Sequence, residues 1–174
     1  RNKVKNLSNN ASELIKADKN NNTTKIYFSY AWGDDSETGE SREKIVGDLY
    51  ESLKNDGFDV FRDKEDSEYK DLISDMMKDI GRGQFIVVAI SDKYLKSPNC
   101  MYEMYEIFRN SKLEKDKFIQ KIYPIRVENI SLSKPKVLAE YFKYWKEQEN
   151  EWKDLIEAFG SSISPEQQIK YKRI

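Results

Sequence analysis

The sequence predicts an α/β sandwich in which helices cover both faces of a parallel sheet. Short apolar segments typical of strands alternate with helical patterns along the chain. One segment, FIVVAI at residues 85–90, is apolar at every position, as expected for a strand buried on both faces. Right-handed crossovers place helices on the two faces of such a sheet. We therefore predict a three-layer sandwich with five parallel strands.

The elements begin after an asparagine-rich stretch. Residues 1–24 have the composition of a linker or tail, with a short helical pattern at 11–17. KIYFSY at 25–30 predicts the first strand. Apolar residues at 3.6 periodicity between 45 and 53 predict a helix, and Gly57 stands where a helix C′ residue is expected.

The middle of the chain continues the alternation. A second strand is predicted at 58–61, and a helix at 72–80 that Gly81 ends. The strand at 85–90 follows, and a helix runs from Pro98 to about Asn110. Ser97 is a plausible N-cap for this helix, and proline suits its first position.

The last third predicts the remaining strands. KFIQKIYPIRV at 117–127 predicts a fourth strand. Residues 134–141 predict a short helix, 142–145 a fifth short strand and 148–159 a last helix. With five strands, the flavodoxin-like order 2-1-3-4-5 is favoured, and its ligand crevice lies at the carboxyl ends of strands 1 and 3.

Length and composition fit one soluble domain. The 174 residues divide into a linker or tail at 1–24, a domain at 25–160 and a C-terminal extension at 161–174. The net charge of −1 indicates no general affinity for nucleic acid. No apolar run approaches the roughly 18 residues that a membrane helix needs. The single cysteine, Cys100, suits a reducing compartment, so we expect a cytoplasmic location without membrane attachment.

The residue inventory excludes several kinds of active site. The chain has no histidine and one cysteine, which removes Ser-His-Asp and Cys-His nucleophile systems and histidine- or thiolate-based metal sites. We therefore expect no metal. Any catalysis must use carboxylates, lysines, hydroxyls or backbone groups.

Two glutamates stand near the predicted crevice. Strand 1 ends in Ser29-Tyr30-Ala31-Trp32, and the helix from Pro98 follows strand 3, so the two segments border one crevice. A core stripe of Met101, Met104, Tyr105 and Phe108 places Glu103 and Glu106 on the opposite, polar side of that helix. Glu103 is nearer the helix N-terminus and is preferred on geometry.

The segments KIYFSYAW and GFDVFRDKEDSEYKDLISDMMKDIGRGQFIVVAISDKYLKSPNCMYEM carry a family resemblance. Together they resemble a bacterial Toll/interleukin-1 receptor (TIR) domain of the NAD⁺-cleaving type, over about residues 25–160. The most specific part is S-x-x-Y-x-x-S-x-x-C-x-x-E, which ends at Glu103. The resemblance implies that Glu103 is catalytic, that NAD⁺ is the substrate and that no cofactor is used.

The resemblance also implies a substrate-binding set and a function. The set is Ser29, Tyr30, Ala31, Trp32, Asp63, Tyr69, Asn99 and Cys100. Asp63 and Tyr69 belong to the BB loop, which closes over the site and mediates self-association. Many active relatives have a base-stacking tryptophan where this chain has Asn99, so stacking must come from Trp32, Tyr69 or a neighbouring subunit.

Three functions compete on these grounds. The first is cleavage of NAD⁺ to nicotinamide and ADP-ribose or a cyclic isomer, in an antiphage effector that oligomerises through a sensor domain absent from this chain. The second is a non-catalytic TIR–TIR adaptor. The third is a phosphoacceptor receiver domain on the same fold, for which Asp92 and Asp34–Asp35 follow strands 3 and 1.

Overall fold

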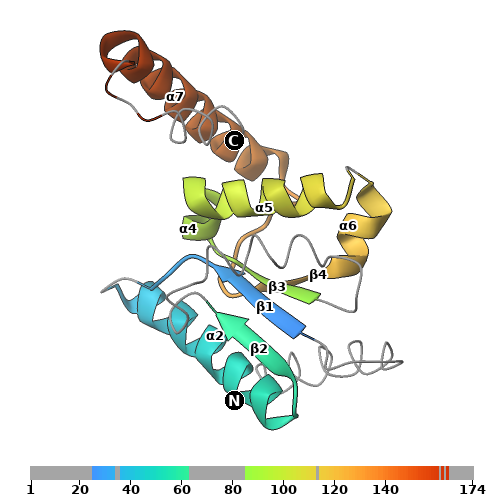
Figure 1. Ribbon diagram of the computed structural model, residues 1–174. Helices are drawn as coiled ribbons and strands as arrows, with labels where there is room; N and C mark the ends of the chain where they lie inside the picture. The colour runs from blue at the N-terminus through green and yellow to red at the C-terminus, as the bar shows by residue number, and fades with distance from the viewer. Residues whose placement is uncertain are drawn as a thin grey trace.

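The sheet has four parallel strands in the part of the chain that the structure describes. The computed structural model describes residues 25–33, 36–62, 85–112, 114–160, 162 and 164. The strands are β1 (Lys25–Tyr30), β2 (Asp59–Arg62), β3 (Phe85–Ile90) and β4 (Ile122–Arg126), in the order β2-β1-β3-β4. The predicted order 2-1-3-4 is confirmed for these strands (Figure 1).

Alternation along β1 sends its side chains into two cores. Ile26, Phe28 and Tyr30 pack on one face against α2 (Glu37–Asn55). Tyr27 and Ala31 pack on the other face, which α4 (Asp92–Leu95), α5 (Pro98–Asn110) and α6 (Lys115–Lys121) cover (Figure 1). Burying each large apolar side chain contributes about 1.5–3 kcal/mol. Because successive side chains of a strand point to opposite faces, the sheet is covered by helices on both sides and the domain has three layers.

Helix α2 is longer than its apolar pattern predicts. It begins after Ser36, whose hydroxyl accepts a 3.1 Å hydrogen bond from the backbone N–H of Gly39. At its other end Gly57 has a φ of 85°, so the predicted C′ glycine is confirmed. Gly57 N–H donates to Lys54 O and Phe58 N–H to Leu53 O, the pair of bonds that defines a Schellman motif.

The segment 117–127 is only partly a strand. Residues 115–121 form α6 instead, because Phe118 turns back to pack edge-on against Phe108 of α5, with ring centroids 5.2 Å apart. The strand β4 starts at Ile122 and contains Pro124. Among the described strands β4 lies at the edge of the sheet, where a proline is tolerated.

The predicted helix–strand–helix at 134–159 is wrong. These residues form one helix, α7 (Pro135–Phe159), and the described part of the chain has no fifth strand. The aromatic residues of 142–145 favour a strand only by local propensity. Helix propagation overrides that preference, and ion pairs such as Lys143–Glu147, at 3.8 Å, support it.

Some predictions fall on residues outside the described ranges. These are the helices at 11–17 and 72–80 and the linker at 1–24. Within the described ranges, no helix combines the length and the apolar character needed to cross a membrane.

Candidate active site

Ser29 lies at the carboxyl end of β1 and faces α5. Its two neighbours Phe28 and Tyr30 enter the α2 core, so alternation turns the Ser29 hydroxyl to the other face. The residue is 4% exposed. A hydroxyl at such a position must find hydrogen-bond partners within the protein.

Two side chains satisfy that hydroxyl. Ser29 Oγ donates a 3.0 Å hydrogen bond to Glu103 Oε2, and a second contact of 3.0 Å joins Ser29 Oγ to the hydroxyl oxygen of Tyr94. Because Ser29 has one proton and gives it to the carboxylate, Tyr94 is the donor in the second bond. The result is a one-way chain of hydrogen bonds, from Tyr94 through Ser29 to Glu103.

Tyr94 is suited to remain the donor. It comes from α4 and is buried in the core beneath α5. Burial raises the pKa of its hydroxyl far above the ordinary value, and the nearby Cys100 and Glu103 add to this, although the bond to Ser29 acts in the opposite direction. A neutral Tyr94 therefore holds Ser29 in the orientation that serves Glu103.

Helix α5 brings Glu103 to the end of β1. Ser97 caps it by accepting a 3.3 Å bond from Cys100 N–H, which confirms the predicted start. Cys100 and Ile107 point into the core against the sheet, and Glu103 lies beside them, half-buried. The prediction that Glu103 lies on the side away from the core is wrong, because Cys100 and Ile107 fix the rotation of the helix.

The prediction for Glu106 is also wrong. Glu106 is 6% exposed, not solvated. Arg109 Nη2 donates to Glu106 Oε2 at 2.5 Å, three residues further along the same helix. The carboxylate is therefore neutralised within α5.

The loop after β1 is fixed to α2. Gly33 N–H donates a 2.8 Å hydrogen bond to Glu43 Oε2. A Cβ atom on Gly33 would lie 3.1 Å from the same oxygen and 3.2 Å from Gly39 O, so a side chain there would crowd the loop. This attachment leaves the preceding Trp32 50% exposed next to the end of β1.

A comparison with known protein families matches residues 26–158 to the family described as TIR domain. The chain belongs to the TIR domain family. The match covers the described sheet and α7 except for their terminal residues Lys25 and Phe159. No solved structure matches the chain. TIR domains include NAD⁺-cleaving enzymes as well as adaptors, and they commonly self-associate.

The structure gives each residue of the spaced motif in this TIR domain a physical role. Ser91 and Ser97 cap α4 and α5, and Cys100 fills the core. Tyr94 and Glu103 occupy the two ends of the hydrogen-bond chain through Ser29. Sequence reasoning used Tyr94 only to identify the motif and gave it no role. The available signal was its place in the motif, nine residues before Glu103.

The other predicted binding residues differ in accessibility. Trp32 and Asn99 are exposed beside the end of β1 and at the start of α5, respectively. Ala31 and Cys100 are buried in the core on the α5 side of the sheet, whereas Tyr30 is buried on the opposite face, in the core against α2. Asp63 and Tyr69 lie outside the described residues.

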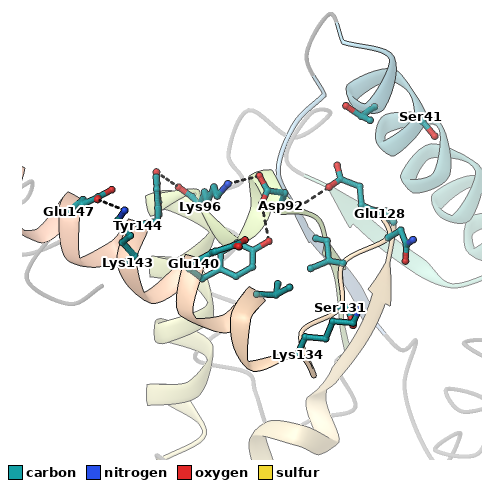
Figure 2. A pocket seen from close by; sticks show the side chains of 16 residues that line it. Ser41, Asp92, Lys96, Glu128, Ser131, Lys134, Glu140, Lys143, Tyr144 and Glu147 are labelled. Atoms are coloured by element: carbon teal, nitrogen blue, oxygen red, sulfur yellow. Dashed lines mark hydrogen bonds and ion pairs between the residues drawn. The ribbon is translucent and has the colours of Figure 1, made fainter.

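A separate groove opens where β3 and β4 end, between α2 and α7 (Figure 2). It has a volume of about 990 Å³, and Glu103 does not line it. Asp92 is its central group and accepts 2.9 Å bonds from Lys96 Nζ and from the Tyr141 hydroxyl. Asp92 N–H donates to Glu128 Oε2, while Glu128 Oε1 pairs with Arg42.

These groups serve to join the elements around the groove. The buried Arg42 of α2 holds Glu128, which follows β4, and Glu128 holds the start of α4. Burial, and then the bond to Asp92, raise the pKa of the Tyr141 hydroxyl, so it remains a donor. Asp92, Lys96, Glu128 and Arg42 therefore bind one another across the groove.

Proposed function

We propose that this TIR domain cleaves the nicotinamide–ribose bond of NAD⁺ with Glu103 as its catalytic residue. The observation that carries the proposal is the Ser29–Glu103 hydrogen bond at the carboxyl end of β1. It holds a half-buried carboxylate in a defined orientation at the edge of a parallel sheet, where open α/β folds bind ligands. Family membership supplies the reaction class.

The reaction suits a single carboxylate. Breaking the glycosidic bond develops positive charge on the ribose, and a fixed negative charge stabilises that oxocarbenium-like state. Nicotinamide leaves as a neutral molecule, so no acid is needed to protonate it. Water then completes hydrolysis to ADP-ribose, or a nucleophile within the substrate gives a cyclic isomer. NAD⁺ is the substrate, and the proposed reaction uses no cofactor.

Trp32 is the residue that we propose to stack on the nucleotide. Asn99 has no ring, and among the described residues of the predicted set Trp32 is the exposed aromatic. An indole face contributes strongly to binding a flat base. Trp32 lies in the loop after β1. Glu43 fixes this loop by accepting a hydrogen bond from Gly33 N–H.

The biological setting that we propose is an effector that acts when assembled. Self-association is common among TIR domains, and a sensor domain elsewhere in a longer protein would drive it. We propose a bacterial antiphage or signalling protein of the cytoplasm as the parent.

Mutation of two neighbouring glutamates tests the reaction. NAD⁺ loss and its products are measured by mass spectrometry with concentrated or crowded protein. Glu103→Gln keeps the size of the side chain and removes its charge, so we expect a fall of at least about 100-fold, the scale of losing one fixed charge-stabilising group. Glu106→Gln is the matched control and should retain turnover.

Three results would contradict this assignment. Unchanged turnover in Glu103→Gln removes that residue from the mechanism. Full loss in Glu106→Gln, with an active Glu103→Gln, reverses the two roles. Self-association without NAD⁺ turnover under every assembly condition favours the adaptor function instead.

A further inference from the structure

Helix α7 contacts the rest of the domain through its first three turns. The Tyr141 hydroxyl donates to Asp92, the Tyr144 hydroxyl to Lys96 O and the Trp145 indole N–H to Leu95 O, the latter two at 3.0 Å. The second half of the helix then projects away from the sheet and from α5 (Figure 1). Along its length none of its described side chains is fully buried.

An apolar seam runs along α7, from the turns that contact the domain, where Trp145 is half-buried, into the projecting part. The residues of the seam follow one another at alternating intervals of four and three positions. Glu149, in the middle, is the one polar residue among them. The apolar members are Leu138, Phe142, Trp145, Trp152, Ile156 and Phe159. Phe142 is 73% exposed and Phe159 is 59% exposed. Alternating steps of four and three are the pattern by which two helices pack side by side.

The charges on α7 and its N-cap are divided between the two ends. Residues 134–146 contain four lysines and one glutamate, whereas residues 147–159 contain five carboxylates and one lysine. In an antiparallel pair the basic half of one helix lies along the acidic half of the other. A parallel pair would set like halves together, which is unfavourable at distances within the Debye length of about 8 Å.

We propose that two copies of this chain associate through α7 in an antiparallel arrangement. The seam supplies the contact area. The division of charge favours a second copy of α7 as the partner and an antiparallel orientation of the two helices. Phe142, close to the body of its own domain, is then covered by the projecting half of the partner helix. An anionic lipid surface is disfavoured as the alternative partner of the seam, because the second half of α7 is acidic. The pairing specifies a surface for the assembly step of the proposed function, but it does not depend on NAD⁺ cleavage.

A charge exchange tests the pairing directly. Lys143→Glu with Lys146→Glu makes both halves of α7 acidic, and Asp154→Lys with Glu157→Lys removes the net negative charge of the second half. All four side chains are exposed, so each variant should fold like wild type by circular dichroism. By sedimentation equilibrium, wild type should dimerise, each variant alone should dimerise at least tenfold more weakly, and an equimolar mixture should recover the dimer.

Direction and surface are tested separately. Cysteines introduced singly as Leu138→Cys and Phe159→Cys should cross-link in a mixture of the two variants, and neither should cross-link with itself. Replacing Phe142 and Phe159 by serine should weaken the dimer at least tenfold. Glu103→Gln should dimerise like wild type, so loss of catalysis and loss of pairing are distinguishable.

Four outcomes would overturn the proposal. They are a wild-type chain that is monomeric at every concentration, a dimer that the serine replacements do not weaken, cross-linking of each cysteine variant with itself, and seam-dependent binding to phosphatidylserine vesicles without dimerisation. Dimerisation only after removal of residues 161–174 would assign the seam to this chain's own C-terminal segment and also overturn it.

Discussion

Glu103 and Glu106 lie one turn apart on α5, yet their surroundings separate them. Glu103 is half-buried and accepts a hydrogen bond from a neutral hydroxyl on β1. Glu106 is more deeply buried and is bound by the guanidinium of Arg109 on its own helix. An arginine partner neutralises a carboxylate, whereas a hydroxyl orients it and leaves its charge. The identity of the partner therefore separates the two glutamates better than burial does.

Arg109→Gln gives the largest expected effect on stability. The Glu106 side chain is 8% exposed and that of Arg109 is 47% exposed, so the substitution removes the cation from a buried carboxylate. We expect the free energy of unfolding to fall by about 2 kcal/mol, the scale of a hydrogen bond to a charged group. Denaturant unfolding measures it, and NAD⁺ turnover per folded molecule should be unchanged.

A double variant sharpens that result. With Glu106→Gln already present, no buried charge depends on position 109, so Arg109→Gln should then cost much less. An equal cost in both backgrounds would mean that Arg109 stabilises the fold by some means other than its ion pair with Glu106.

Ser29→Ala tests the other member of the comparison. The substitution removes the donor to Glu103 Oε2 without altering the charge of Glu103. We expect turnover to fall about tenfold, because this corresponds to losing one hydrogen bond to a charged group. Tyr94→Phe is the milder partner variant, because Ser29 keeps its own hydroxyl. Equal turnover in wild type and Ser29→Ala would show that Glu103 needs no orientation by Ser29.

Glu149 is a third glutamate, on the surface of α7, and its substitution should have the smallest effect on stability. Hydrogen bonds from Lys146 and Lys153 lower the pKa of Glu149 from 4.5 to about 2. Because the folded pKa is depressed, its contribution to stability is present above pH 4.5 and is lost as the pH falls through about 2. The melting temperatures of wild type and Glu149→Gln, in dilute solution, should differ slightly at pH 7 and converge near pH 2. A constant difference would contradict this.

The sequence predicts the sheet well because buried parallel strands leave a strong signal. KIYFSY and FIVVAI fall on β1 and β3 without adjustment. The rotation of α5 about its axis could not be predicted in the same way, because its core-facing positions include Cys100, which is small and weakly hydrophobic. The aromatics of 142–145 favour strand locally, and only the helical residues on both sides decide against it.

The position of Glu103 beside the end of β1 was predictable from the sequence, and its hydrogen-bond contacts were not. The motif and the crevice both select Glu103, and the structure places it against Ser29 from the predicted set. The Ser29–Glu103 and Gly33–Glu43 hydrogen bonds connect residues that only the fold brings together. No local pattern encodes such a pair.

The direction of the hydrogen-bond chain from Tyr94 to Glu103 has a consequence for how the rate depends on pH. Burial raises the pKa of Tyr94 far above its ordinary value, so its hydroxyl stays protonated at neutral and mildly alkaline pH. Ser29 does not ionise in water, so Glu103 is the one group in this chain of three that changes its charge. A plot of turnover against pH should therefore rise through a single ionisation and then stay level through neutral and mildly alkaline pH.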